Sequence, residues 1–297
     1  MEIEHDQQVL VGDPTVIFLH IGKTAGTTLR QVLRRNFRAS QVMLVRVHGR
    51  PREETLDRFA ALPEAMRARP RLLVGHTVYG LHEFVPRPSV YISMVRKPFS
   101  LVLSQYRFVL RTPGHRHHEI VTSKRMSIGD YVKSGISMEM DNSQTRAIAG
   151  DRSTPFGGCS NEMLETAKRH IDRSFAVVGL TERFDESLIL LRKMFGWSKL
   201  HYVSANVAPR EPLEISDEVR DLIEEHNRLD NELYLYVDER FDEASARYPT
   251  FEEELIRFQR ANARYRPLGN LMHTVPRSLS TKLGLRRVLS RTSAPSI

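Results

Sequence analysis

The sequence predicts an α/β protein with three layers, in which a central parallel β-sheet is covered by helices on both faces. Short apolar runs rich in β-branched residues alternate with amphipathic helical patterns, as expected for buried parallel strands and their crossover helices. The first apolar run passes through a glycine-containing turn directly into a helical pattern. The chain has 297 residues, which is enough for one large domain of this class.

Four apolar runs are the predicted strands of this sheet, and helical patterns follow them. After the first strand, a helix begins at Thr27 and places Leu29 and Leu33 on one face. After the third strand, Pro98 suits the first position of a helix, where its missing N–H group costs nothing. The predicted strands are Thr15–Ile21, Arg71–His76, Ser89–Val95 and Phe175–Leu180.

The remaining segments are assigned by the same patterns. Residues 50–70 predict two short helices, and residues 185–197 predict a helix after the fourth strand. A long amphipathic helix is predicted from Ser216, a suitable N-cap, to about Phe241. The polar segments 111–127 and 151–160 are predicted loops, because they lack a period of apolar residues.

Positive charge is concentrated at one end of the chain. The formal net charge is +8, and residues 260–297 hold eight Lys or Arg residues and no Asp or Glu. Residues 1–259 hold 36 basic and 36 acidic residues. We therefore predict a single domain over 1–259 and a basic tail over 260–297. The tail is either a loosely ordered end or a contact with a membrane surface or an anionic glycan. The neutral body argues against nucleic acid as the main partner.

The composition also bears on location. One cysteine, Cys159, excludes an intramolecular disulfide, which fits a reducing compartment. The acidic N-terminal stretch has no apolar signal core, and no run approaches the length of a membrane span. We expect a cytoplasmic protein.

The first turn has the composition of an anion-binding loop. Its backbone N–H groups and the following helix dipole attract negative charge, and lysine and threonine add a full charge and hydroxyl donors. The loop lacks the first glycine of a nucleoside-triphosphate loop, because Ile17 stands at that position. The alternative is an ordinary strand–helix turn. The residues offered to an anion are Lys23, Thr24, Ala25, Gly26, Thr27 and Thr28.

A second anion-binding element follows the third strand. Arg96 comes at the end of that strand, and Ser104 lies eight residues later in the predicted helix. A guanidinium group matches the geometry of a phosphate, and a serine adds one more hydrogen bond. Taken alone, these residues could equally be a capping arginine and a solvent-facing serine. Together with the first loop, they indicate a ligand that carries phosphate at both ends.

The two elements resemble the cofactor signatures of sulfotransferases that use 3′-phosphoadenosine 5′-phosphosulfate (PAPS). The stretches are "HIGKTAGTTL" and "VRKPFSLVLSQY", and the closer resemblance is to carbohydrate sulfotransferases and the heparan sulfate 2-O-sulfotransferase branch with its bacterial relatives. Further similar blocks are "VGHTVYGLH", "DNSQTRAIAG", "VVGLTERFDESLILLRKMFGW" and "HNRLDNELYLYVDERF". The resemblance covers about Thr15 to Phe241. The family commonly has proline before the loop lysine, where this chain has Gly22, so we expect a looser turn.

The resemblance implies a P-loop-like nucleotide-binding fold and an enzyme that transfers a sulfuryl group from PAPS to a hydroxyl group, releasing 3′,5′-ADP. The acceptor would be a glycan, a glycolipid or a small metabolite. Lys23 would neutralise charge on the leaving group, and Arg96 and Ser104 would hold the 3′-phosphate. No metal would be required. The 5′-phosphosulfate would be held by Lys23, Thr24, Ala25, Gly26, Thr27 and Thr28.

A hydroxyl acceptor needs a base, and His76 is the candidate. It ends the second predicted strand, and the 2-O-sulfotransferase-like branch carries a histidine in a matching Gly-His context. Imidazole titrates near neutrality and can accept a proton as the new bond forms. The alternative is a histidine that merely ends a strand. His20 is the rival base, but it lies inside the first strand and is interpreted either as structural or as a support for the residues that contact the ligand.

Two further motifs are left without a role. His115, His117 and His118 lack the spacing of a helical zinc pair, so we predict a solvated loop that borders the acceptor site. Within "DNSQTR", the side chains of Asn142, Gln144 or Arg146 could contact the acceptor.

Two other functions stay open at this point. A nucleotide kinase or NTPase would use the Gly-Lys-Thr turn, although it lacks the first glycine and an evident acidic magnesium ligand. A protein that binds anionic polymers would use the basic tail.

Overall fold

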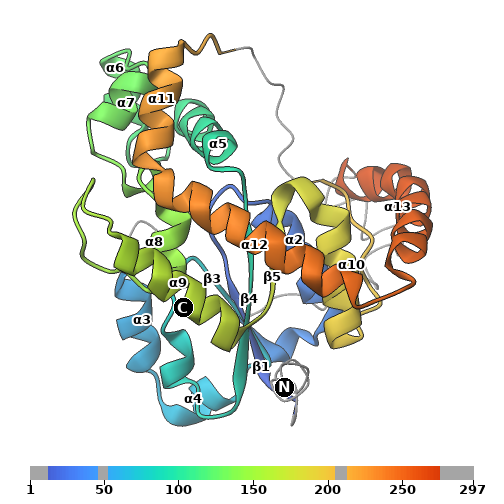
Figure 1. Cartoon of the computed structure of the whole chain (residues 1–297). Helices are drawn as coiled ribbons and strands as arrows, with labels where there is room; N and C mark the ends of the chain where they lie inside the picture. Colours follow the sequence, from blue (N-terminus) through green and yellow to red (C-terminus); the bar gives the residue numbers. More distant parts are fainter. Residues whose placement is uncertain (1–12, 46–52, 205–212, 275–297) are drawn as a thin grey trace.

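The computed structural model describes residues 13–45, 53–204 and 213–274. Within these residues, five parallel strands form one sheet in the order β2-β3-β1-β4-β5 (Figure 1), which confirms the predicted fold class. The edge strand β2 was not predicted, because its four apolar residues give too short a pattern. The strands are β1 (Thr15–Leu19), β2 (Val42–Val45), β3 (Leu72–Gly75), β4 (Ser89–Val95) and β5 (Phe175–Leu180).

Helices cover the sheet and extend beyond one end of it. In Figure 1, α9 and α12 cross in front of the sheet, while α5, α6, α7 and α11 gather at its upper end. The 3₁₀ helices are η1 (Ala39–Gln41), η2 (Leu81–Phe84), η3 (Met138–Met140) and η4 (Thr181–Arg183). The α-helices are α2 (Gly26–Asn36), α3 (Glu53–Ala60), α4 (Glu64–Ala68), α5 (Pro98–Arg111), α6 (His118–Ser123), α7 (Ile128–Lys133), α8 (Ser143–Ala149), α9 (Asn161–Ser174), α10 (Phe184–Phe195), α11 (Asp217–His226), α12 (Arg228–Ala246) and α13 (Phe251–Thr274).

The buried apolar side chains of the described residues form two clusters. The larger cluster contains the strands together with residues of α2, α9, α10 and α12. The smaller one joins α5, α6, α7 and α11 through residues such as Tyr106, Tyr131 and Ile223. We call these four helices the helical cap. Because α5 begins just after β4, the cap starts at the carboxyl end of the sheet.

The strand order places the candidate site residues together at the carboxyl ends of β1, β3 and β4. Leu19 at the end of β1 pairs with Gly75 on one side and with Ser93 on the other. The chain leaves β1 toward β2 and leaves β4 toward β5, so the connections diverge between these neighbouring strands. Open parallel sheets bind ligands in the crevice at such a switch point, outside the carboxyl ends of the strands.

The predicted long helix is broken. It appears as α11 and α12, and Asn227 lies between them. The Asn227 side chain donates to the carbonyl oxygen of Met140 (2.9 Å) and accepts from the backbone N–H group of Asn142 (3.2 Å). These bonds reach a segment more than 80 residues away, which a local helical pattern does not reveal.

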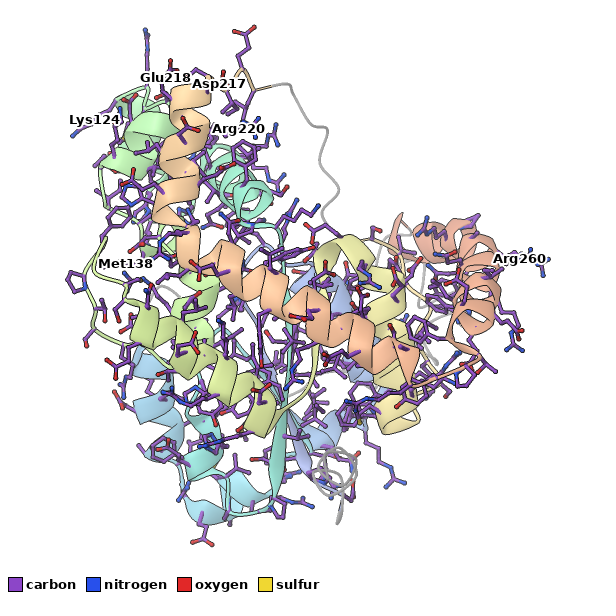
Figure 2. All side chains as sticks on the ribbon, in the orientation of Figure 1. Lys124, Met138, Asp217, Glu218, Arg220 and Arg260 are labelled. Carbon is purple, nitrogen blue, oxygen red and sulfur yellow. The ribbon has the colours of Figure 1, made fainter. Side chains whose placement is uncertain are left out.

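Helix α13 crosses the predicted boundary at 259/260. Leu255 and Phe258 are buried in the larger cluster, and the side-chain oxygen of Asn262 accepts from the N–H group of Tyr202 (2.8 Å). Arg260 points away from the body (Figure 2). The stretch up to Thr274 is thus helical, and residues 275–297 of the predicted tail lie outside the described residues. None of the helices in the described ranges is both long and apolar enough to cross a membrane.

Candidate anion-binding site at the carboxyl edge of the sheet

The turn after β1 is strained at two residues. Lys23 and Ala25 adopt left-handed backbone conformations, with φ of 65° and 57°. A non-glycine residue in this region costs about 1 kcal/mol or more, and such residues cluster at functional sites. Ala25 is the N-cap of α2 and makes no side-chain cap hydrogen bond. The Thr28 N–H group donates to the Ala25 carbonyl oxygen (3.0 Å), so the first-turn N–H groups that can serve another acceptor are those of Gly26 and Thr27. This arrangement suits an anion.

Gly26 packs closely against the side chain of His20. A Cβ atom there would lie 2.0 Å from Cδ2 of His20, far inside van der Waals contact. His20 is 5% exposed. The Cα atom of Gly26 therefore packs against the buried His20 ring, which leaves no room for a side chain at this position.

The three threonines of the turn differ. The Thr24 side chain is buried, and its hydroxyl donates to the carbonyl oxygen of Ile21 (2.9 Å). This corrects the expectation that the Thr24 hydroxyl is open to an anion, and any such contact falls to its backbone. The Thr28 side chain is buried, whereas Thr27 is half-exposed. Thr27 is therefore the most accessible hydroxyl of the three.

The Lys23 ammonium lies in a positively charged environment. Its Nζ atom is 4.1 Å from the centre of the Phe108 ring on α5. Burial, and then the charges of Arg111 and Arg96, lower the pKa of Lys23 from 10.5 to about 8. An anion bound here would relieve the repulsion among these cations and stabilise the protonated lysine.

Arg96 lies directly beside the first turn. Its Nη1 atom donates to the carbonyl oxygen of Lys23 (3.0 Å), so the two predicted anion-binding elements meet. Ser104 is half-buried on α5, at i and i+4 with Phe108 and at i and i+7 with Arg111. These spacings place Ser104 on the helix face that turns toward Lys23.

His76 follows β3, immediately beside β1. Its ring stacks on that of His20, with centroids 4.0 Å apart. His20 in turn stacks on Phe18 (5.2 Å). His76 is half-exposed, whereas His20 is pressed between its neighbours. The accessible imidazole at this edge is thus that of His76, and the interpretation of His20 as structural is consistent with its burial.

The His115–His118 segment is not a simple loop, because α6 begins at His118. The His115 ring packs edge-on against Phe108 (5.6 Å), which places the segment next to the Lys23 site. His117 Nδ1 lies 2.7 Å from the Tyr131 hydroxyl. Burial lowers the pKa of both His115 and His117. Across the described ranges, no group of three or more His, Cys, Asp or Glu side chains is placed to hold a metal.

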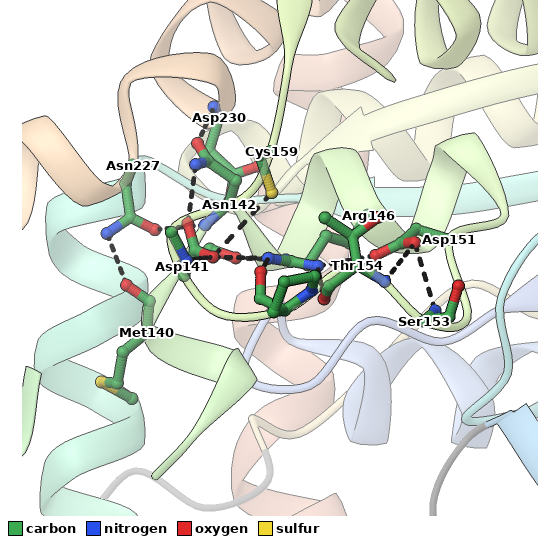
Figure 3. Close-up of polar contacts among 12 residues, drawn as sticks. Met140, Asp141, Asn142, Arg146, Asp151, Ser153, Thr154, Cys159, Asn227 and Asp230 are labelled. Carbon is green, nitrogen blue, oxygen red and sulfur yellow. Dashed lines mark hydrogen bonds and ion pairs between the residues drawn. The ribbon is translucent and has the colours of Figure 1, made fainter. Parts of the chain in front are cut away.

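One contributor was missed from the sequence, and a second was named there for a different contact. Phe108 lies on α5, two residues beyond the end of "VRKPFSLVLSQY". No sequence pattern marks it, and only its contact with Lys23 identifies it. Gln144 binds the backbone of Arg96 at both N–H and carbonyl groups. The side chains of "DNSQTR" that were candidates for contact with the acceptor are buried. Arg146, for example, bonds to Asp141 (2.5 Å) and Asp151 (2.6 Å), as Figure 3 shows.

The fold and the site first define a class: α/β proteins that carry a cationic turn, suited to an anion, at the switch point of a parallel sheet. A family model of galactose-3-O-sulfotransferases matches residues 10–268. The chain belongs to this family of carbohydrate sulfotransferases.

Curated relatives agree with this family. Heparan-sulfate 6-O-sulfotransferase 2 of Homo sapiens is 27% identical over 308 residues, covering 89% of this chain and 50% of that protein. Heparan-sulfate 6-O-sulfotransferase 3 of Mus musculus is 26% identical, covering 78% and 58%. Galactose-3-O-sulfotransferase 3 of Homo sapiens is 26% identical, covering 62% and 45%. The chain thus spans about half the length of these relatives.

Proposed function

We propose that this protein is a sulfotransferase that moves the sulfuryl group of PAPS to a hydroxyl group of a carbohydrate. The observation that carries the proposal is the meeting of Lys23 and Arg96 beside the uncapped N-terminus of α2. A nucleotide with phosphate at both its 3′ and 5′ positions needs two such anion-binding elements within the length of one molecule. Membership of the family supports the same donor.

PAPS, when bound, supplies an activated sulfuryl group whose S–O bond to the 5′-phosphate can break. The N–H groups of α2 and the Thr27 hydroxyl bind the 5′ end, and Arg96 and Ser104 bind the 3′-phosphate. Lys23 stabilises the negative charge that grows on the leaving 5′-phosphate as 3′,5′-ADP forms.

His76 acts as the general base in this proposal. As the acceptor oxygen forms its bond to sulfur, the proton of the hydroxyl passes to the imidazole. The half-exposed ring at the end of β3 is accessible to an acceptor, whereas His20 is not. The ring stack with His20 fixes the orientation of His76.

The acceptor is proposed from the named substrates of the relatives, heparan sulfate and galactose. Transfer to the 6-O or 3-O position follows from those names, and the resemblance to the 2-O-sulfotransferase branch stays a prediction. The cytoplasmic location, the absence of a metal requirement and the contact of the tail with a membrane or anionic glycan also stay predictions.

Nucleoside-triphosphate hydrolysis is the weaker alternative. The position where that class of loop has its first glycine is Ile17, which lies inside β1 and is 1% exposed. The turn therefore begins too late to wrap a triphosphate as those enzymes do.

The test combines binding and turnover. Calorimetry should show that 3′,5′-ADP binds more tightly than 5′-AMP, and that Lys23→Ala and Arg96→Ala weaken it. Incubation with labelled PAPS and a panel of heparan sulfates, galactosides, glycolipids and metabolites should label a carbohydrate. His76→Ala should still bind 3′,5′-ADP but lose transfer. Equal affinity for the two nucleotides, or magnesium-dependent ATP hydrolysis in place of transfer, would contradict the proposal.

A further inference from the structure

We propose that Gln144 is a positioning residue of the nucleotide site, because its side-chain amide holds the backbone of Arg96 and thereby sets where the guanidinium group meets the 3′-phosphate. This inference rests on the proposed function. It concerns the "DNSQTR" segment, which the sequence left without a role.

The contact is a two-bond clamp. Gln144 Oε1 accepts from the backbone N–H group of Arg96 (2.8 Å), and Gln144 Nε2 donates to the Arg96 carbonyl oxygen (2.9 Å). The last pair of the sheet on this strand joins Val95 to Leu180. Arg96 therefore lies one residue past the ladder, where the glutamine side chain takes the place of a strand partner.

The clamp is itself fixed to a rigid helix. Gln144 is 1% exposed, and its backbone N–H group donates to Oδ2 of Asp230 on α12 (3.1 Å). Oδ1 of Asp230 accepts from both the N–H group and the hydroxyl of Thr145, each at 2.7 Å. The N–H group of Asp230 donates to Oδ1 of Asn142 (3.1 Å), which Figure 3 shows beside it. Together these hydrogen bonds restrict the movement of Gln144.

The clamp acts on the nucleotide through Arg96. The guanidinium group of Arg96 reaches the carbonyl oxygen of Lys23, so its position is set from its own backbone and from the first turn. Loss of the clamp frees the backbone end. The expected consequence is a selective loss of 3′-phosphate binding, since the groups assigned to the 5′ end belong to the first turn and α2.

The test compares two nucleotides in one variant. Gln144→Met keeps the length of the side chain and removes both hydrogen bonds. We expect the preference for 3′,5′-ADP over 5′-AMP to fall by about tenfold, the equivalent of one or two hydrogen bonds, while the affinity for 5′-AMP stays unchanged. The matched control is Gln105→Met, because Gln105 is also buried but its amide donates to Glu139 in η3 and not to Arg96.

The outcomes separate the inference from the proposed function. A folded Gln144→Met protein with an unchanged preference overturns the inference, as does an equal loss for both nucleotides that Gln105→Met reproduces. A wild-type protein with no preference for 3′,5′-ADP instead overturns the 3′-phosphate contact in the proposed function.

Two further measurements test the inference if the Gln144→Met protein does not fold. Gln144→Glu keeps the acceptor for the Arg96 N–H group but sets an oxygen against the Arg96 carbonyl, so the preference should fall here too. In the wild-type protein, hydrogen exchange of the Arg96 amide should be slow, because this N–H group is held beyond the end of the sheet. Exchange as fast as in an open loop overturns the inference.

Discussion

The two anion-binding elements are built in opposite ways. The turn after β1 is strained at Lys23 and Ala25, and it holds an ammonium group whose pKa is lowered by burial and then by neighbouring arginines. The end of β4 is relaxed and braced, since Gln144 binds both backbone groups of Arg96. The first element stores unfavourable backbone and charge interactions that an anion can relieve. The second element holds Arg96 in a fixed position for the ligand to bind.

The largest effect on stability is expected from a substitution of Asp230, whose carboxylate holds Gln144 and Thr145 in place. Asp230→Ala removes the acceptor of three donors and leaves the N–H groups of Gln144 and Thr145 buried without it. We expect the free energy of unfolding to fall by about 3 kcal/mol, measured by denaturant titration.

The control for Asp230→Ala is Asp238→Ala on the same helix, because Asp238 makes a half-exposed ion pair with Arg183. Such a pair contributes at most about 1 kcal/mol. If the two variants lose the same stability, the bracing at Asp230 is not what the contacts indicate.

The next effect tests the strained element. Gly26→Ala places a Cβ atom against the buried His20 ring, which must shift and take the stacked His76 ring with it. We expect a loss of about 2 kcal/mol in the free energy of unfolding, together with loss of transfer activity, measured by thermal unfolding and turnover.

Gly114→Ala is the matched control for Gly26→Ala, because a Cβ atom there meets nothing within 4 Å. The double variant His20→Ala with Gly26→Ala should recover part of the stability lost by Gly26→Ala, since the two sites are in contact. Additive losses would contradict a clash between them.

The affinity for the nucleotide, measured as a function of pH, tests the contribution of the Lys23 charge in the first element. The protonated form of Lys23 attracts the nucleotide, and a bound anion raises the pKa of Lys23 above about 8. The affinity for 3′,5′-ADP should therefore be complete below that value and fall, by at most about tenfold per pH unit, above it. Calorimetry from pH 6.5 to 9.5 checks this direction. Lys23→Arg, whose side chain stays charged, should remove the dependence, and an unchanged slope would exclude Lys23 as its source.

The smallest effect concerns Phe108. Phe108→Leu keeps an apolar neighbour but removes the ring face from the Lys23 ammonium. A cation–π contact of about 0.5–1 kcal/mol corresponds to roughly half a pKa unit, so the midpoint of the affinity profile should move to lower pH by that amount. Phe108→Tyr keeps the ring and should leave the midpoint in place. A midpoint that moves upward in Phe108→Leu would mean that the ring acts mainly by excluding water.

The sequence predicts local features of this molecule well and distant ones poorly. β4 and β5 have the predicted bounds, and the motif brings Lys23 to the correct strand end, because apolar runs and turn residues act on their own neighbours. The break at Asn227 depends on Met140 and Asn142, and the clamp on Arg96 joins residues 48 positions apart. The purpose of Gly26 likewise depends on the direction of one side chain. Such contacts arise only when the tertiary fold brings the segments together.

The site draws its lysine from the sheet and the aromatic neighbour of that lysine from the helical cap. The buried side chains of the sheet and of the cap form separate clusters, and the contact between Lys23 and Phe108 joins the turn after β1 to helix α5 of the cap, so the ionisation of the Lys23 amino group depends on how the cap packs on the sheet. A substitution that loosens the cap at Tyr131, which contacts His117, would then change the protonation of Lys23 before the protein as a whole lost its structure.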